Sequence, residues 1–217
     1  MNNIKNIIFD LGGVIVDLDI KPAMMAFAQL GLTSQNIKLS DLSTNGIPKD
    51  WEMARLMHAM DRGDINARQF IDILHSQCRP DATDEEIINA FNRIIIIRKQ
   101  RLQWLLQLRK KYRVFLLSNL GEIHWTETRR QSESLGIRFE DCFDAVFLSY
   151  LLRMAKPDPR IFEHVIKTTG IVPGETLYID DLPDNIEVGR QLGLQAHKVP
   201  CNGLDDELLQ LFPELLH

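Results

Sequence analysis

Residues 6–14 read Asn-Ile-Ile-Phe-Asp-Leu-Gly-Gly-Val, a short apolar run that ends in an aspartate followed by two glycines. The consecutive apolar residues Ile7 to Phe9 are typical of a strand that is covered on both faces. Asp10 stands at the end of this strand, where a carboxylate can act as a nucleophile, and the glycines let backbone N–H groups approach an anion. The alternative is an aspartate that caps a turn and glycines that only form it.

Four further runs with a branched or aromatic apolar centre follow: Arg113–Ser118, Asp144–Ser149, Thr176–Asp180 and Leu194–Val199. From the second strand onward, helical patterns separate the strands: Glu122–Leu135, Pro159–Thr169 and Asn185–Leu192. An alternation of strand and helix predicts a parallel sheet with right-handed crossovers. We therefore expect an α/β fold, a doubly wound, parallel, five-stranded Rossmann-like core.

The connection between the first and second strands is much longer than the others and almost wholly helical. Its expected helices are Lys21–Leu30, Ser34–Leu42, Lys49–Met60, Asn66–Gln77, Asp84–Ile97 and, returning to the sheet, Lys99–Lys111. Because a crossover needs only one helix, most of this segment is an insertion. We expect residues 17–98 to form a helical cap subdomain and residues 1–16 and 99–217 to form the core.

The composition of the chain is that of a globular protein with a small acidic excess. Its 217 residues include 25 basic and 30 acidic side chains, a formal net charge of −5, and 45% are hydrophobic. This acidity argues against a nucleic-acid partner. One stretch, from Arg93 to Arg113, holds eight basic residues and no acidic one. We interpret it as a solvated helix face rather than an anion or nucleic-acid site, because no pattern of stacking aromatic residues accompanies the charges.

Membrane insertion and secretion are not expected from the sequence. The chain has no run approaching the roughly 20 apolar residues that a spanning helix needs. Its N-terminus lacks the anatomy of a signal peptide. Cys78, Cys142 and Cys201 are odd in number, and their wide spacing matches neither a zinc site nor a disulfide framework. A reducing, cytoplasmic location is the expectation.

Polar residues also lie at the end of the second predicted strand and just before a predicted helix. Ser118 and Asn119 end the second strand, where a hydroxyl and an amide can donate hydrogen bonds to phosphate, or cap the next helix instead. Lys156 lies just before a helix start, which favours anions. Neighbouring prolines restrict its backbone, whereas a freely solvated lysine is the alternative.

Asp180 and Asp181 end the fourth strand, and two adjacent carboxylates repel each other unless a cation lies between them. Oxygen ligation by a few carboxylates is what Mg²⁺ prefers, and an acidic loop without a metal is the alternative. The carboxyl ends of parallel strands share one edge of the sheet. A nucleophile, a hydroxyl donor, a lysine and a carboxylate pair at that edge make a phosphoryl-transfer site.

With these motifs in this order, the chain resembles the haloacid dehalogenase-like hydrolase superfamily over essentially its whole length. The resemblance implies that Asp10 is the nucleophile and forms an aspartyl-phosphate. It implies that Ser118 binds the phosphoryl group with help from the backbone of Asn119, and that Lys156 neutralises the charge on nucleophile and phosphate.

The same resemblance implies a Mg²⁺ site. Its ligands are Asp10, the backbone carbonyl of Gly12, Asp181 and Asp180, directly or through water. Asp17 falls where capped members of the superfamily often have an aspartate, and we expect its role to be structural.

Gly12 departs from the pattern of most phosphatases of the superfamily, which have a second aspartate there as general acid and base. The loop as it stands resembles a subgroup that includes an α-D-glucose-1-phosphate phosphatase. Haloacid dehalogenases also lack the second aspartate, but they use no magnesium and have no carboxylate pair after this strand. Asp180 and Asp181 therefore favour a phosphatase. A 2-haloacid dehalogenase-type hydrolase, and a phosphate-binding module with little turnover, are the alternatives.

The proton that Gly12 cannot supply could come from His124, near the start of a helix at the same edge. The other interpretation, which we favour, is that His124 packs at the interface with the cap. Without a general acid, an enzyme depends on a good leaving group, which favours sugar 1-phosphates and aryl phosphates over sugar 6-phosphates.

We expect Mg²⁺-dependent hydrolysis of a small phosphorylated metabolite, with sugar phosphates as candidates. A cap that closes over the site excludes bulk water and large substrates. The expected assembly is a monomer or a weak homodimer.

Overall fold

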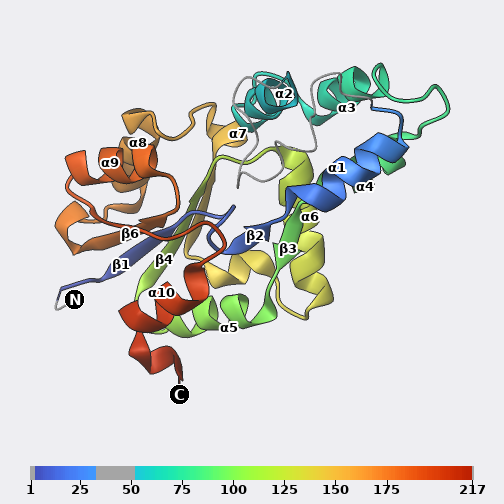
Figure 1. The fold of residues 1–217 in the computed structure, drawn as a ribbon. Coiled ribbons are helices and arrows are strands. Elements are labelled where there is room, and N and C mark those ends of the chain that lie inside the picture. The colour runs from blue at the N-terminus through green and yellow to red at the C-terminus, as the bar shows by residue number, and fades with distance from the viewer. Residues whose placement is uncertain (1–2, 33–51, 217) are drawn as a thin grey trace.

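The computed structural model of the chain describes residues 3–32 and 52–216. Five parallel strands form its main sheet, in the spatial order β5 (Ala145–Leu148), β4 (Arg113–Ser118), β1 (Asn6–Phe9), β6 (Thr176–Asp180) and β7 (Gln195–Lys198) (Figure 1). These are the five strands expected from the sequence, with bounds that differ by at most two residues. The predicted fold class is confirmed.

Both faces of the sheet are covered, which explains the uninterrupted apolar runs of its strands. In β1, Ile7 and Phe9 pack on one face while Ile8 packs on the other. The first face meets α5 (Lys99–Leu108) and α10 (Leu204–Leu211), and the second meets α8 (Pro159–Thr169) and α9 (Pro183–Gln191) (Figure 1). The central strand is therefore fully buried, and only its carboxyl end is free to carry a site.

The helices of the insertion are α1 (Ile20–Gln29), α2 (Glu52–Asp61), α3 (Ala67–His75) and α4 (Asp84–Asn92). They correspond to four of the expected helices; a fifth, Ser34–Leu42, lies outside the described residues. The helices α1 to α4 bury an apolar cluster of their own, which includes Phe27, Phe70 and Phe91. Ile123 of α6 (Glu122–Ser134) joins this cluster, so the insertion packs directly on the helix that follows β4.

The prediction of a helix over residues 84–97 is wrong at its C-terminal end. The helix stops at Asn92, and Ile95–Ile97 forms strand β3, which pairs antiparallel with β2 (Val16–Leu18). Four consecutive isoleucines, residues 94–97, favour an extended backbone because their branched side chains are restricted in a helix. The pair β2–β3 thus joins the two ends of the insertion. The short helices α7 (Ser149–Leu152) and α10 were not expected either.

A buried ion pair fixes β2 to the core. The Asp17 carboxylate lies 2.6 Å from Nη1 of Arg101, whose side chain is only 1% exposed. Arg101 also donates to the carbonyl of Val14 and pairs through Nε with Asp205 of α10, at 2.5 Å. Asp17 therefore has the structural surroundings expected of it, at the junction of β2, α5 and α10.

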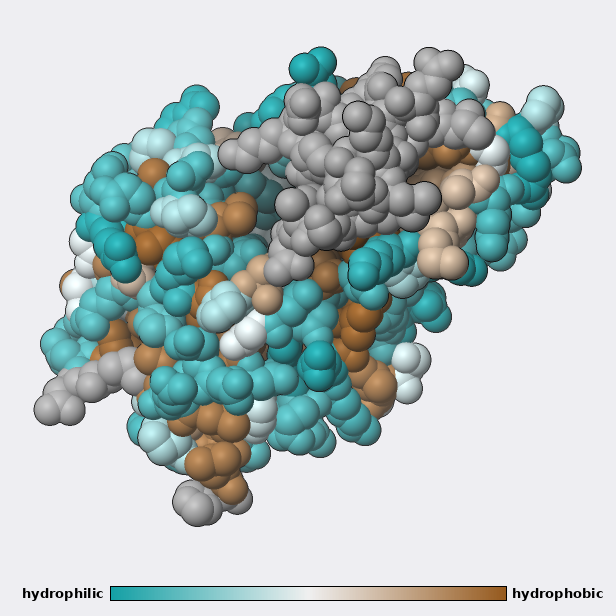
Figure 2. Space-filling view, viewed as in Figure 1, coloured by the Kyte–Doolittle hydropathy of each residue, from teal (hydrophilic) through white to brown (hydrophobic). Residues whose placement is uncertain are grey.

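Four of the eight basic residues between Arg93 and Arg113 form ion pairs. Arg98 and Arg101 pair with Asp17, Arg109 with Asp144, and Lys111 with Glu214. On the face shown in Figure 2 the described surface is mainly hydrophilic, and apolar residues occur in small separate groups. No helix among the described residues has the length and apolarity needed to cross a membrane.

We predict that Asp17→Ala lowers the free energy of unfolding by about 3 kcal/mol, because it leaves the buried Arg101 guanidinium short of a partner. Urea denaturation measures the change. The control is Arg68→Ala, which removes exposed ion pairs with Asp72 and Asp84, and should cost less than about 1 kcal/mol. Equal losses in the two variants would contradict a structural role for Asp17.

Candidate active site

The predicted site residues meet at one edge of the sheet. Asp10 follows β1, while Ser118 and Asp180 end the two strands that flank it, β4 and β6. Phe9 is in register with Leu116 on one side and with Ile179 on the other, so the three carboxyl ends are level. Ser118, Asp10 and Asp180 are each less than 9% exposed.

Lys156 links two of these carboxylates. Its Nζ lies 2.8 Å from Oδ1 of Asp10 and 2.7 Å from Oδ2 of Asp180, and its side chain is 1% exposed. Burial lowers the pKa of Lys156, but the two carboxylates outweigh it and the net shift is upward. The ammonium is therefore permanently charged at neutral pH and directed at the predicted nucleophile.

Asn119 holds the loop that carries Lys156. The Asn119 side chain accepts a hydrogen bond from the backbone N–H of Lys156 and donates one to its carbonyl, both at 2.8 Å. The peptide bond between Lys156 and Pro157 is cis. The Asn119 side chain is thus committed to positioning the lysine, which leaves its backbone for the predicted contact with a phosphoryl group.

Asp180 is surrounded by donors. Its carboxylate accepts hydrogen bonds from the phenol of Tyr178, from the backbone N–H of Leu182 at 2.8 Å and from the Asn185 amide at 3.0 Å, in addition to the Lys156 contact. Burial raises the pKa of Asp180, but Lys156 and these donors reverse the shift, and the pKa is lowered. Asp180 stays ionised without a metal ion.

Tyr178 and Asn185 were not predicted as site residues, although each leaves a trace in the sequence. Tyr178 precedes Asp180 by two positions, and alternate residues of a strand share a face. Asn185 lies in the first turn of the helix that follows the acidic pair. A polar residue at either position is a signal, but the contact itself depends on how the loop folds.

Asp10, Asp180 and Asp181 each offer an oxygen atom within 4.8 Å of those of the other two. One ammonium faces these three carboxylates, so negative charge is in excess. Burial, together with Asp180, raises the pKa of Asp181. Burial and the two neighbouring carboxylates also raise the pKa of Asp10, to about 7, against the opposing effect of Lys156. A hard divalent cation would relieve this repulsion and suits an all-oxygen site.

Gly13 is required where the loop after β1 passes Asp181. Its φ of +73° lies in the left-handed region, and a Cβ there would come within 2.7 Å of Oδ2 of Asp181 and 2.9 Å of Sγ of Cys201. Gly12 has no positive φ, and a Cβ at that position would meet only a methyl group of Leu18 at 3.2 Å. An aspartate at position 12 therefore needs only a small shift of a flexible side chain.

His124 is not at the reacting edge. Its ring stacks on Phe91 of α4, with centroids 3.9 Å apart, and its Nε2 lies 3.2 Å from the Phe91 carbonyl oxygen. Burial lowers the pKa of His124 to about 4, so the imidazole is neutral at pH 7. These contacts match the favoured interpretation of a histidine packed between helix and cap.

The sequence profile of the haloacid dehalogenase-like hydrolases matches residues 4–193. The chain belongs to this family. It is 37% identical over 208 residues to a D-ribitol-5-phosphate phosphatase of Bacteroides thetaiotaomicron, an alignment that covers 93% of this chain and 94% of the relative. The predicted superfamily, and the prediction of a phosphatase within it, are confirmed.

Solved structures of similar proteins agree. A HAD family enzyme from Bacteroides thetaiotaomicron superposes with a TM-score of 0.83 at 32% identity, covering 95% of this chain and 98% of that one. The same enzyme has been crystallised with magnesium and inorganic phosphate, with a TM-score of 0.80 over 94% of this chain and 98% of that one. A HAD-like hydrolase from Porphyromonas gingivalis superposes with a TM-score of 0.77 at 26% identity, over 99% of this chain and 98% of that one.

The prediction of Mg²⁺ as cofactor is confirmed. The ion is bound in structures of the similar enzyme, and this chain has an acidic triad of the matching chemistry. Two dehalogenases also superpose, at 15% and 18% identity, a similarity that extends to the fold alone.

We predict that Asp10→Asn changes how the metal-free protein responds to pH. Folded Asp10 keeps its proton up to about pH 7, whereas its ordinary value is 3.8. Between these values the folded state binds more protons, so stability is full at low pH and is lost as the pH rises. Asparagine does not titrate, so the variant does not lose stability in this way as the pH rises. Its free energy of unfolding relative to that of the wild type should therefore increase by roughly 3–4 kcal/mol from pH 4 to pH 8.

Urea denaturation in EDTA at several pH values measures this difference. Asp184→Asn, which removes an exposed carboxylate a few residues beyond Asp181, serves as the control. A stability difference between Asp10→Asn and wild type that stays constant with pH would show that Asp10 is ionised throughout.

Proposed function

We propose that the chain hydrolyses a small phosphorylated metabolite in two steps, through an aspartyl-phosphate, the acyl phosphate of Asp10. The observation that carries this proposal is the buried Lys156 ammonium in contact with Asp10, inside an acidic triad that is short of positive charge. An ionised carboxylate beside a fixed cation, at an open strand end, is suited to attack an anionic phosphoryl group.

In the first step an Asp10 oxygen forms a bond to phosphorus, the bond from phosphorus to the leaving oxygen breaks, and that oxygen takes up a proton from water. Lys156 offsets the charge that the phosphoryl group brings to Asp10. The Ser118 hydroxyl and the backbone N–H of Asn119 would hold the phosphoryl oxygens. In the second step water attacks phosphorus, which frees the Asp10 carboxylate and releases inorganic phosphate.

Asp10, Asp181 and the carbonyl of Gly12 would hold Mg²⁺, which when bound neutralises charge on the carboxylates and the phosphoryl oxygens. Asp180 is different, because donors already occupy both of its oxygens. We propose that Asp180 positions Lys156, and that it stabilises Mg²⁺ by the negative charge of its carboxylate or through a bridging water molecule. Residues 17–98 are proposed as the cap, and residues 1–16 and 99–217 as the core.

The candidates for the substrate are sugar and polyol phosphates. The relative named above acts on D-ribitol 5-phosphate, which is an ester of a primary alcohol. The resemblance to a glucose-1-phosphate phosphatase subgroup, together with Gly12, favours an anomeric leaving group instead. We propose a polyol phosphate, because the relative matches this chain over nearly its full length.

The other two candidate functions are tested by the same assay. A dehalogenase would release chloride from 2-chloropropionate without magnesium, and a binding module would retain phosphate or vanadate without turnover. The acidic triad favours a phosphatase over a dehalogenase, because it can hold a divalent cation and haloacid dehalogenases use none. A cytoplasmic location and a monomeric or weakly dimeric state stay predictions.

We predict that wild-type protein hydrolyses para-nitrophenyl phosphate only with Mg²⁺, and that Asp10→Asn lowers turnover by about 10³-fold or more, since an amide cannot attack phosphorus. Asp181→Ala should abolish the response to Mg²⁺. Circular dichroism checks that each variant is folded, and Asp184→Asn is the active control. An Asp10→Asn enzyme with appreciable turnover would exclude Asp10 as the nucleophile.

We predict that the missing acid at position 12 makes the first step depend on the leaving group. In the burst phase, aryl phosphates and glucose 1-phosphate should react faster than D-ribitol 5-phosphate. Gly12→Asp should reduce the difference in burst rate between these substrates, since general acid catalysis is worth about 10²–10⁴ in rate. Rapid-quench measurements give the burst rates. Equal native rates for all esters would mean that another residue supplies the proton.

A further inference from the structure

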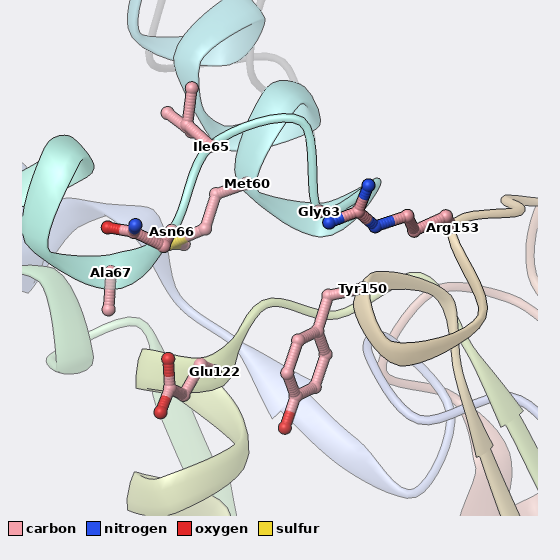
Figure 3. Close-up of a pocket in the computed structure, with 8 residues that line it drawn as sticks. All are labelled: Met60, Gly63, Ile65, Asn66, Ala67, Glu122, Tyr150 and Arg153. Atoms are coloured by element: carbon pink, nitrogen blue, oxygen red, sulfur yellow. The ribbon is translucent and has the colours of Figure 1, made fainter.

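A pocket of about 180 Å³ lies between the insertion and the core. Met60, Ile65 and Asn66 line it from α2 and the turn that leads to α3, whereas Glu122, Tyr150 and Arg153 line it from the core (Figure 3). At about 30 Å³ for each water molecule of the liquid, it holds about six waters. This is the scale of a small metabolite fragment.

Two glycines bring the walls of this pocket together. A Cβ on Gly121 of the core would lie 2.8 Å from Cε of Met60, and a Cβ on Gly63 would lie 2.5 Å from the carbonyl oxygen of Tyr150. The carbonyl of Asp61 also accepts a hydrogen bond from the Ser149 hydroxyl. The end of α2 is therefore seated on the loops that follow β4 and β5, and the pocket is formed by this contact.

The core side of the pocket is carried by segments that leave the same edge of the sheet as the predicted site residues. Glu122 follows Ser118 by four residues, and Ser118 is the register partner of Leu148, two residues before Tyr150. Arg153 precedes Lys156 by three residues. Only β4 lies between β1 and β5 in the sheet, so the strand that leads to Tyr150 and Arg153 lies about 10 Å from β1, at roughly 4.8 Å for each strand spacing. A phosphorylated chain of several carbon atoms spans such a distance.

The pocket offers both donors and acceptors on an apolar floor. Within residues 3–32 and 52–216, neither Glu122 nor Arg153 has an ion-pair or hydrogen-bond partner. Burial and the Glu122 carboxylate raise the pKa of Tyr150, so its phenol stays protonated and can donate. Met60 and Ile65 supply the apolar surface. A chain of hydroxyl-bearing carbons matches this lining, because each hydroxyl both donates and accepts while each carbon is apolar.

We propose that this pocket binds the hydroxylated chain of the leaving group, and that Glu122 and Arg153 determine specificity for polyol phosphates over short esters. The proposal rests on the phosphatase function proposed above and adds the part of the protein that distinguishes its substrates. Neither residue takes part in the chemical step, so their removal should affect only substrates long enough to reach the pocket.

The test compares kcat/KM for three substrates, acetyl phosphate, which is an acyl phosphate, and the esters glycerol 3-phosphate and D-ribitol 5-phosphate, in wild type, Glu122→Gln and Arg153→Asn. Asparagine is chosen because Arg153 has a φ of +51°, which asparagine tolerates better than most residues. Each variant should lose about tenfold or more with D-ribitol 5-phosphate, as expected when a hydrogen bond to a charged group is removed. Acetyl phosphate should be unaffected.

The matched controls are Glu133→Gln, on the exposed end of the same helix as Glu122, and Arg138→Gln, an exposed arginine on the loop beyond it. Both should behave as wild type with every substrate. Equal losses with all three substrates, or no loss with any, would overturn the pocket assignment while leaving the phosphatase intact. A wild-type protein that hydrolyses none of these substrates, nor para-nitrophenyl phosphate, would instead overturn the proposed function.

Discussion

A single ammonium group shared by buried carboxylates is the constraint around which this protein is arranged. Lys156 has no access to water, so its charge persists only because Asp10 and Asp180 lie within 3 Å of it. Each neighbour then serves this contact. Tyr178 and Asn185 keep Asp180 ionised, and Asn119 fixes the backbone of the lysine. The nucleophile gains a fixed cation without needing a flexible side chain to find it.

The parts of the fold that could be predicted from sequence are those set by local pattern. The strands ending at Ser118 and Asp180 are buried on both faces, so their apolar runs are short and unbroken, and the polar residues that end them mark the reacting edge. The strand at Ile95–Ile97 was missed because its isoleucines directly follow a helical pattern. Its extended form is stabilised by contacts with distant segments, above all the pairing with Val16–Leu18.

The contacts within the site were less predictable because they also depend on segments that are distant in the sequence. That Asn119 would bond the backbone of Lys156, or that Tyr178 would reach Asp180, depends on the path of a loop and on a choice of rotamer. Neither has a local signature. The His124 ring shows the same limit. The sequence places His124 near the start of the helix after β4, but its stacking on Phe91 depends on where α4 lies.

The antiparallel pair β2–β3 has a consequence for how such proteins diversify. Leu18 and Ile95 are register partners, so the inserted chain leaves the core and returns to it at adjacent points. A segment whose ends already meet adds no closure constraint to the rest of the chain. Its length and sequence can therefore change, in evolution or by grafting, while β1 keeps its register with β4 and β6. The inserted segment, which contributes to substrate selection, can therefore change without altering the catalytic edge of the sheet.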